Sequence, residues 1–281
     1  MAQQFGPYLA ERRIGEGAAG TVYLSRDPRT GLALAIKTLT LGSEFEPEAL
    51  TEARQRFTRE AQAAGRLKHR GIVTILDAGE HSGLAWMAME HLPGRDLSHH
   101  VAQNKLLPVA AVLRIGARVA EALAHAHRQG VVHRDVKPAH VMVELAADSI
   151  KLTDFGIAFM ADAHRTRTGM LLGTPAYMSP EQIAGQRLDG RSDLYSLAVT
   201  LFQLLCGRLP HEAASMAAQM RQIAQQPAPD IRSLHPQLPA ALADAVAQAL
   251  EKRPESRPAD GDRMAAALRA AGDAMAAAAP A

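Results

Sequence analysis

A cluster of glycines near the N-terminus has the spacing of a loop that approaches phosphate groups. Gly15, Gly17 and Gly20 form a G-x-G-x-x-G pattern, in which the backbone can come close to a phosphate because no Cβ stands in the way. The same pattern occurs in dinucleotide-binding turns, which lead from a strand into a helix. Here the glycines lead into Thr-Val-Tyr-Leu-Ser-Arg-Asp, whose alternation predicts a strand. The sequence therefore favours a glycine-rich flap between two strands, lying over a nucleotide.

A lysine at the end of an apolar run is a second candidate for phosphate contact. Lys37 follows the run 34–36 and is similar to the strand lysine that grips nucleotide phosphates. Without that role it would be a solvated strand end. A lysine of this kind needs a carboxylate to hold it, and the helical periodicity over 47–68 supplies two, Glu52 and Glu60.

The elements that must position these residues change character along the chain. The first ninety residues read mainly as short strands, with apolar runs or alternation at 22–24, 34–36, 72–78 and 84–89. The remainder reads mainly as helices, with a long helix over 109–129 and two short strands at 141–143 and 150–152. A β-rich part followed by a helical part predicts two lobes with a cleft between them.

Two more motifs follow in the second half of the chain. His-Arg-Asp-Val-Lys-Pro-Ala-His occupies 133–140, and Asp-Phe-Gly at 154–156 is followed by Ser-Pro-Glu at 179–181. Together with the glycine pattern and Lys37, their order and spacing resemble the protein kinase family over about residues 8–268. The resemblance is strongest to bacterial Ser/Thr protein kinases of the eukaryotic type.

The resemblance implies a bilobal α+β fold. A small β-rich N-lobe with one key helix would span about 8–90, a hinge 90–95, and a larger, mainly helical C-lobe 96–268. The catalytic domain would thus occupy 1–268, followed by an Ala-rich tail at 269–281.

The catalytic residues are likewise implied by the match to the family motifs. Lys37 would contact the α- and β-phosphates of ATP and be held by Glu60, since the family has its acid at that position. Asp135 matches the residue that accepts the proton of the substrate hydroxyl, and Lys137 would touch the γ-phosphate. Asp154 matches the ligand of Mg²⁺. The implied reaction is phosphoryl transfer, which depends on positioning and charge neutralisation.

A further group of residues is implied to surround the nucleotide. The three glycines would cover the phosphates, four apolar residues would enclose the adenine, two hinge residues would bond it through their backbone, and a gatekeeper would stand beside it. Without the resemblance to the family, each of these apolar residues would be interpreted as an ordinary residue of the hydrophobic core. The glycines are Gly15, Gly17 and Gly20, and the residues that would enclose the adenine are Ile14, Val22, Ala35 and Met142. The hinge residues are Glu90 and Leu92, and the gatekeeper is Met89.

Other residues indicate the class of substrate and the mode of control. Lys137 and the segment Gly-Thr-Pro-Ala-Tyr, which includes Thr174, are typical of Ser/Thr kinases rather than Tyr kinases. Arg134, beside the implied catalytic Asp, implies activation by phosphorylation of the loop that follows, because a phosphate would give the Arg a charged partner. Thr166 and Thr168 are the candidate phosphorylation sites, and ordinary polar loop residues are the alternative.

One motif position departs from the family pattern. The family has a metal-ligating Asn five residues after the catalytic Asp, and this chain has His140. Mg²⁺ prefers oxygen ligands, whereas imidazole suits softer metals, so Mn²⁺ would be tolerated better than Mg²⁺. His140 could also donate a hydrogen bond to the region of Asp135 and thereby replace part of the orienting role of Asn.

Three structural roles are also expected. The resemblance implies a C-lobe ion pair between Glu181 and Arg257, and it makes Asp193 the residue that braces the catalytic loop. Cys206 lies in an apolar run, which predicts a buried small hydrophobe.

Composition excludes several classes of protein. A net charge of +2 and 4% aromatic residues do not support nucleic-acid binding, and a single cysteine excludes an internal disulfide and a Cys-based zinc cluster. No signal pattern or stretch of membrane-spanning length is seen, so a cytoplasmic location is expected. The expected partners are ATP and proteins with Ser or Thr residues, and the resemblance to bacterial kinases also allows a homodimer through the small lobe.

Three functions remain open from the sequence. The first is an active Ser/Thr kinase that autophosphorylates. The second is a pseudokinase or weakly active kinase that acts as a signalling scaffold, which His140 favours and the intact Lys37, Asp135 and Asp154 oppose. The third is a small-molecule phosphotransferase of similar fold, which the Gly-Thr-Pro-Ala-Tyr and Ser-Pro-Glu motifs oppose because they belong to a platform for protein substrates.

Overall fold

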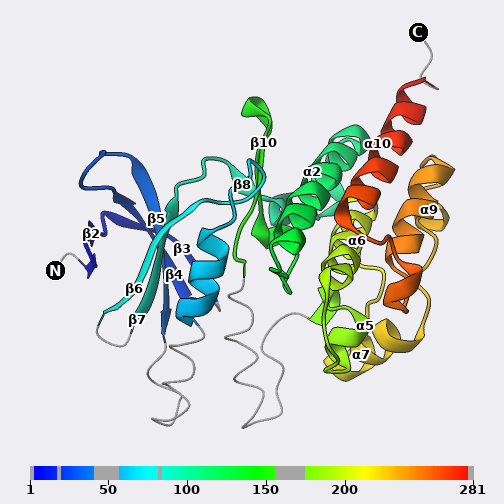
Figure 1. Ribbon diagram of the computed structural model, residues 1–281. Coiled ribbons are helices and arrows are strands. Elements are labelled where there is room, and N and C mark those ends of the chain that lie inside the picture. Colours follow the sequence, from blue (N-terminus) through cyan, green and yellow to red (C-terminus); the bar gives the residue numbers. More distant parts are fainter. Residues whose placement is uncertain (1–2, 18–19, 41–56, 82–83, 156–174, 278–281) are drawn as a thin grey trace. The chain divides into compact units, whose positions relative to one another are not determined.

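The computed structural model describes residues 3–17, 20–40, 57–81, 84–155 and 175–277 and divides into two compact units (Figure 1). One unit, the N-lobe, contains the described residues up to Pro93 together with Phe155. The other, the C-lobe, contains those from Gly94 to Asp154 and from 175 onward.

The N-lobe is built on an antiparallel sheet of five strands in the order β3-β4-β5-β7-β6. Its strands are β3 (Arg12–Gly17), β4 (Gly20–Arg26), β5 (Ala33–Thr40), β6 (Ile75–His81) and β7 (Leu84–Glu90), and a separate small hairpin pairs β1 (Gln4–Phe5) with β2 (Tyr8–Leu9). One face of the sheet packs against the helix of residues 57–65, and the other packs against the small hairpin around Trp86. The sheet is therefore covered on both faces, which explains why residues 34–39 of β5 and 85–89 of β7 are all buried.

Two predicted N-lobe boundaries differ from the structure. The strand expected over 72–78 begins at Ile75, because the Thr74 amide donates to the Glu90 side chain (2.7 Å to Oε1) instead of to a neighbouring strand. The helix expected over 47–68 is seen at 57–65, and residues 47–56 lie outside the described part of the chain. At its C-terminal end, i to i−3 hydrogen bonds from Arg66 and Leu67 tighten the last turn and end the helix before residue 68.

The C-lobe is mainly helical, as predicted. Its α-helices are α2 (Val109–Arg128), α5 (Pro180–Ile183), α6 (Gly190–Cys206), α7 (Met216–Gln225), α8 (Ile231–Leu234), α9 (Ala240–Ala249) and α10 (Gly261–Ala277). A three-stranded sheet in the order β10-β9-β8 joins β8 (Arg95–Asp96), β9 (Val141–Glu144) and β10 (Ser149–Leu152). Single 3-10 turns lie at Leu97–His100, Gln103–Lys105, Pro138–His140, Leu145–Ala147, Pro175–Tyr177 and Pro254–Ser256.

Helix α6 forms the centre of the C-lobe, and α2, α9 and α10 pack around it (Figure 1). Nearly all of its residues are buried, so it is apolar on all sides rather than along one stripe. Helices α2 and α10 approach closely at Gly261, where a Cβ would lie 2.2 Å from the carbonyl oxygen of Ala120. Helix α10 continues through the Ala-rich segment to Ala277, and Ala271 is fully buried.

Cys206 ends helix α6 and is buried, as predicted. Burial raises the pKa of its thiol to about 11, so the thiol stays protonated and unreactive at neutral pH. Within the part of the chain that the structure describes, no helix is both long enough and apolar enough to cross a membrane.

Candidate active site

The glycine pattern forms a hairpin between β3 and β4, in which Gly17 pairs with Gly20. This arrangement confirms the predicted flap between strands and excludes the strand-to-helix turn of a dinucleotide fold at this point. Gly20 has φ +121°, and a Cβ there would lie 1.7 Å from the carbonyl oxygen of Thr38, so only glycine fits. Ile14 stands at an irregularity of the β3–β4 pairing and is 37% exposed.

Lys37 lies on the sheet face that the helix of residues 57–65 covers. Side chains alternate between the two faces of a strand, so Lys37 shares a face with Ala35 and Leu39. Those two residues pack in one apolar cluster with Phe57 and Ala61 of the helix. Lys37 itself is only 7% exposed, and a buried ammonium group requires an anionic partner.

Glu60 stands on that same helix, directly before Ala61. Lys37 and Glu60 are thus carried by two elements that pack against each other, as the predicted ion pair requires. The pairing itself stays a prediction. The alternative carboxylate, Glu52, lies outside the described residues.

The residues expected around the adenine are divided between the two lobes. Val22 and Leu92 are half-buried against the apolar cluster of the N-lobe, which also contains Ala35 and Met89. Met142 belongs to the C-lobe, where it lies half-buried in β9 and pairs with Lys151 of β10. Val22, Ala35, Met89 and Leu92 therefore gather at the apolar cluster that holds the helix of residues 57–65 against the sheet.

The loop between α2 and the turn Pro138–His140 carries the acidic residue expected to act as the base. The Nζ of Lys137 donates to Oδ2 of Asp135 at 2.6 Å, so the ammonium balances the charge of this carboxylate. The Asp135 amide donates to Nδ1 of His133 at 3.3 Å, which leaves the proton of that ring on Nε2. Nε2 then donates to the Thr153 carbonyl at 2.7 Å and thereby ties the loop to the segment before Asp154.

Asp193 braces this loop from the first turn of α6, as predicted. Its carboxylate accepts hydrogen bonds from the amides of His133 (2.8 Å) and Arg134 (2.7 Å). His127 of α2 contacts the same carboxylate at 2.7 Å through Nε2. Arg134 has φ +70°, a left-handed conformation that is unusual for a residue with a Cβ, and these bonds hold it there.

His140 connects the two acidic residues of the site. Its Nδ1 lies 2.8 Å from the carbonyl oxygen of Asp135, and because a carbonyl can only accept, Nδ1 carries the proton. Its Nε2 lies 3.2 Å from Oδ2 of Asp154, a residue held at φ +65°. Burial lowers the pKa of His140 even though Asp154 and Asp135 act to raise it, which favours the neutral form of the ring. The lone pair of Nε2 therefore faces a carboxylate oxygen.

Nε2 of His140 and Oδ2 of Asp154 face each other, and both atoms can donate an electron pair to a metal ion. A cation held by Nε2 of His140 and the carboxylate of Asp154 would turn a repulsive contact into two coordinate bonds. Among the described residues, no group of three or more His, Cys, Asp and Glu side chains could hold a metal. The remaining ligands would therefore be oxygen atoms of phosphate or water.

The predicted ion pair between Glu181 and Arg257 is present and buried. The guanidinium binds the carboxylate with both ends, at 2.7 and 2.8 Å, and the Ser192 hydroxyl donates to Oε1 at 2.6 Å. The arginine also lies over the ring of Tyr195, 4.9 Å from its centroid. Burial acts to raise the pKa of Glu181, but the hydrogen bonds from Arg257 and Ser192 and the charge of Arg257 outweigh it and lower the pKa.

The sequence analysis did not identify one residue that contacts the loop carrying Asp135. Gln182 donates from Nε2 to the Arg134 carbonyl at 2.6 Å. The readable signal was the pattern Ser-x-x-Gln that begins at Ser179, which predicts a helix cap but not the bond to a distant loop. The candidate phosphorylation sites Thr166 and Thr168, and the docking-loop residue Thr174, lie outside the described residues.

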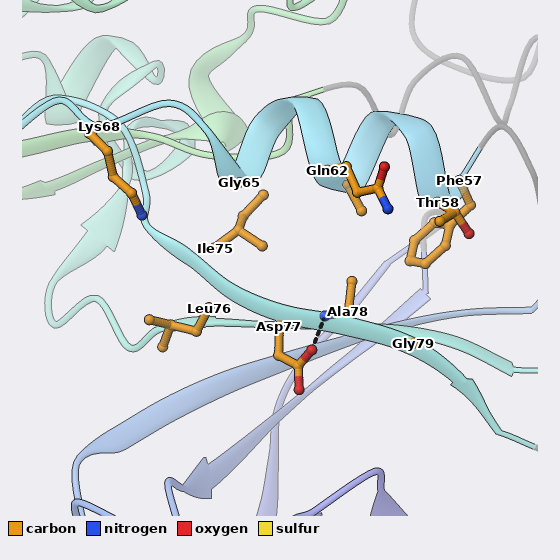
Figure 2. A pocket seen from close by; sticks show the side chains of 11 residues that line it. Phe57, Thr58, Gln62, Gly65, Lys68, Ile75, Leu76, Asp77, Ala78 and Gly79 are labelled. Carbon is orange, nitrogen blue, oxygen red and sulfur yellow. Dashed lines mark hydrogen bonds between the residues drawn. The ribbon is translucent and has the colours of Figure 1, made fainter.

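A cavity of about 450 Å³ lies in the N-lobe between the helix of residues 57–65 and β6 (Figure 2). Apolar side chains such as Phe57 and Ile75 line it together with the polar Gln62, Lys68 and Asp77. None of the residues expected to bind the nucleotide lines this cavity. It is therefore separate from the candidate nucleotide site.

Comparisons with known proteins agree with the motifs. A model of the protein kinase domain family matches residues 8–269. The chain is 39% identical to Serine/threonine-protein kinase Pkn1 of Myxococcus xanthus over 257 residues, which cover 90% of this chain and 36% of that protein. It is 34% identical to Serine/threonine-protein kinase PrkC of Bacillus subtilis over 270 residues, which cover 96% of this chain and 41% of that protein.

A solved structure is similar over nearly its whole length. The kinase domain of PknI from Mycobacterium tuberculosis is 32% identical, with a TM-score of 0.77, and the match covers 96% of this chain and 98% of that one. The chain thus spans less than half the length of the two curated relatives, but almost all of a solved kinase domain.

Proposed function

This chain belongs to the protein kinase family, and we propose on that premise that it transfers the γ-phosphoryl group of ATP to serine and threonine hydroxyls of proteins. The observation that carries the proposal is the pairing of Asp135 with Lys137 at 2.6 Å in a loop braced by Asp193. A carboxylate that is balanced by one ammonium group can accept a proton while the same ammonium group stabilises phosphate charge. The catalytic domain is proposed to occupy residues 1–268.

The proposed reaction assigns a separate role to each charged residue. The substrate hydroxyl oxygen forms a bond to the γ-phosphorus while the bond to the β-phosphate oxygen breaks, so ADP leaves and the hydroxyl proton passes to Asp135. Lys137 neutralises charge on the γ-phosphate, and Lys37, held by Glu60, neutralises the α- and β-phosphates. A divalent cation held by Asp154 and His140 would add charge neutralisation on the phosphate oxygens.

The nucleotide is proposed to bind through the residues that match the nucleotide-binding motifs of the family. Gly15, Gly17 and Gly20 would cover the phosphates, and Glu90 and Leu92 would bond the adenine through their backbone. The pairing of Gly17 with Gly20 supports this role, because it places the glycine pattern in a hairpin between two strands rather than in a strand-to-helix turn. The apolar residues proposed to enclose the adenine are Ile14, Val22, Ala35 and Met142, with Met89 beside them.

His140 is proposed to shift metal preference toward Mn²⁺, because its Nε2 replaces an amide oxygen beside Asp154. For the wild type we expect a higher phosphorylation rate with Mn²⁺ than with Mg²⁺. The variant His140→Asn is expected to raise the Mg²⁺-supported rate severalfold and to reverse that order. The measurement is the initial rate of phosphate transfer from ATP at matched concentrations of each metal. Equal metal preference in the two proteins would contradict the proposal.

Activation by autophosphorylation is proposed at Thr166 and Thr168. Incubation with labelled ATP should place phosphate on one or both threonines, and the variant with both replaced by Ala should phosphorylate an added protein substrate about tenfold more slowly. The physical reason is that a phosphate would pair with Arg134 and order the loop. Mass spectrometry of the labelled protein checks the sites. Protein that binds ATP but incorporates no label with either metal would favour the pseudokinase alternative.

Protein substrates, a cytoplasmic location and a homodimer are the remaining proposals. Three large apolar side chains of the N-lobe, Leu9, Leu32 and Leu76, are 50% or more exposed, and Leu32 is the most exposed of them at 67%. Light scattering of the chain and of Leu32→Asp tests the homodimer, because a monomeric mass for both proteins would contradict it.

A further inference from the structure

The peptide group that joins Arg134 to Asp135 is held at both of its polar ends. Its carbonyl oxygen accepts a hydrogen bond from Nε2 of Gln182 at 2.6 Å, and its N–H donates to Nδ1 of His133 at 3.3 Å. A peptide group is planar, so fixing both ends sets the orientation of the whole plane. The Cα of Asp135 is attached directly to this plane, and its orientation therefore sets where the Asp135 side chain begins.

Arg134, the residue before this peptide group, has a strained backbone conformation that neighbouring residues must hold in place. Arg134 has φ +70°, which a residue with a Cβ adopts only where its surroundings hold it. Its amide is bound by Asp193, and its carbonyl by Gln182. Of these two restraints, only the one from Gln182 acts on the peptide group that leads into Asp135.

The backbone of α5 positions Gln182 for this contact. Ser179 precedes the helix, and its hydroxyl accepts from the Gln182 amide, while Oε1 of Gln182 accepts from the Ser179 amide, both at 3.4 Å. This capping box occupies the oxygen of the side-chain amide and leaves its NH₂ group to reach the loop. The two ends of one side chain therefore perform separable tasks, one in the helix cap and one in the catalytic loop.

We propose that Gln182 is a positioning residue for phosphoryl transfer, which orients Asp135 through the carbonyl of Arg134. The inference rests on the proposed role of Asp135 as the base. Loss of this hydrogen bond lets the peptide group rotate, so a smaller fraction of bound substrate meets the carboxylate in a reactive geometry. The effect falls on turnover rather than on nucleotide binding, because the hydrogen bonds of the Gln182 side chain within the described residues go to Ser179 and Arg134, neither of which is proposed to bind ATP.

Gln182→Glu separates the two tasks of the side chain. A glutamate at this position keeps the oxygen of the capping box and suits the first turn of a helix, but as a carboxylate it cannot donate to the Arg134 carbonyl. We expect kcat to fall about tenfold, with KM for ATP within twofold and the melting temperature lowered by only about 2 to 4 °C, as for the loss of one hydrogen bond. If this variant fails to fold, Gln182→Met, which is uncharged and similar in length, replaces it in the same comparison.

A matched control is available in α7. Gln219 also donates from Nε2 to a backbone carbonyl, that of His211, at 2.8 Å. Gln219→Glu removes the same kind of bond far along the chain from the catalytic loop, and we expect its kcat to stay within twofold of the wild type. An unchanged kcat in Gln182→Glu, an equal loss in Gln219→Glu, or a change confined to KM would each overturn the inference.

Asp135→Asn, measured in parallel, separates this inference from the proposed function. An inactive Asp135→Asn beside a fully active Gln182→Glu would overturn the role of Gln182 alone. An active Asp135→Asn would overturn the role of Asp135 and with it the route by which Gln182 acts.

Discussion

Replacing Asp135 by Asn is expected to lower the rate of phosphoryl transfer about a thousandfold. The amide keeps the size of the side chain and an oxygen that Lys137 can bind, but it cannot accept the proton of the substrate hydroxyl. A positioned general base contributes about a hundredfold to ten-thousandfold to such a step, and this range sets the expected loss. The measurement is kcat with a protein substrate at saturating ATP, together with the affinity for ATP by calorimetry. The affinity should change by less than about twofold, because the proposed role of Asp135 lies in the transfer step.

The control for this variant is Asp148→Asn. Asp148 is also an aspartate of the C-lobe that binds a cation, in this case Arg118, and it has φ +50°, a conformation that Asn tolerates well. Asp148→Asn makes the same chemical change outside the loop that carries Asp135. The rate of phosphoryl transfer should therefore stay within about twofold of the wild type. A rate for Asp135→Asn within tenfold of the wild type would assign proton transfer to another group.

Much of the fold could be predicted because its signals are local. The family membership and the bilobal fold expected from the motifs are confirmed by the match to protein kinase domains. The long helix expected over 109–129 is observed as α2, Val109–Arg128, since its apolar periodicity and the following Gly130 are both readable. The start of β6 was missed because the Thr74 amide bonds to a carboxylate 16 residues away, and no pattern around Thr74 records that bond.

The candidate site shows the same division between local and distant contacts. The positions of Asp135, Lys137 and His140 follow from their motif, and so does the expectation that His140 contacts the region of Asp135. The contact of its other nitrogen with Asp154 depends on how β9 and β10 pair, which spacing alone does not give. Gln182 was missed for a similar reason, because it lies 48 residues from the carbonyl that it binds.

The second large effect concerns stability. Arg257→Ala is expected to lower the free energy of unfolding by about 3 to 5 kcal/mol, because it leaves the carboxylate of Glu181 buried without its cation. Glu181 is 5% exposed, so water cannot replace the lost hydrogen bonds. The variant also removes the contact of the guanidinium with the ring of Tyr195. Urea unfolding at neutral pH measures the loss, which is a large part of the total for a typical domain.

An exposed ion pair of the same lobe provides the contrast. Arg269 binds Glu121 with side chains that are 53% and 24% exposed, and Arg269→Ala should cost less than about 1 kcal/mol. Equal losses in the two arginine variants would mean that the burial of Glu181 does not set the effect. Comparing Arg257→Ala with Arg269→Ala thus separates the free-energy cost of an unpaired buried charge from that of a missing surface contact.

The acid dependence of stability should identify the carboxylate itself. The pKa of Glu181 is lower in the folded chain than its ordinary value of 4.5, so its contribution is complete above that value and is lost as the pH falls through the folded pKa. The advantage of the wild type over Glu181→Gln should therefore be constant near neutral pH and shrink in the acid range below 4.5. A difference that stays constant down to the acid unfolding of both proteins would assign the stabilisation to the shape of the side chain rather than to its charge. A shrinking difference would assign the stabilisation to the ionised pair of Glu181 and Arg257, which lies one residue before Gln182 in the chain.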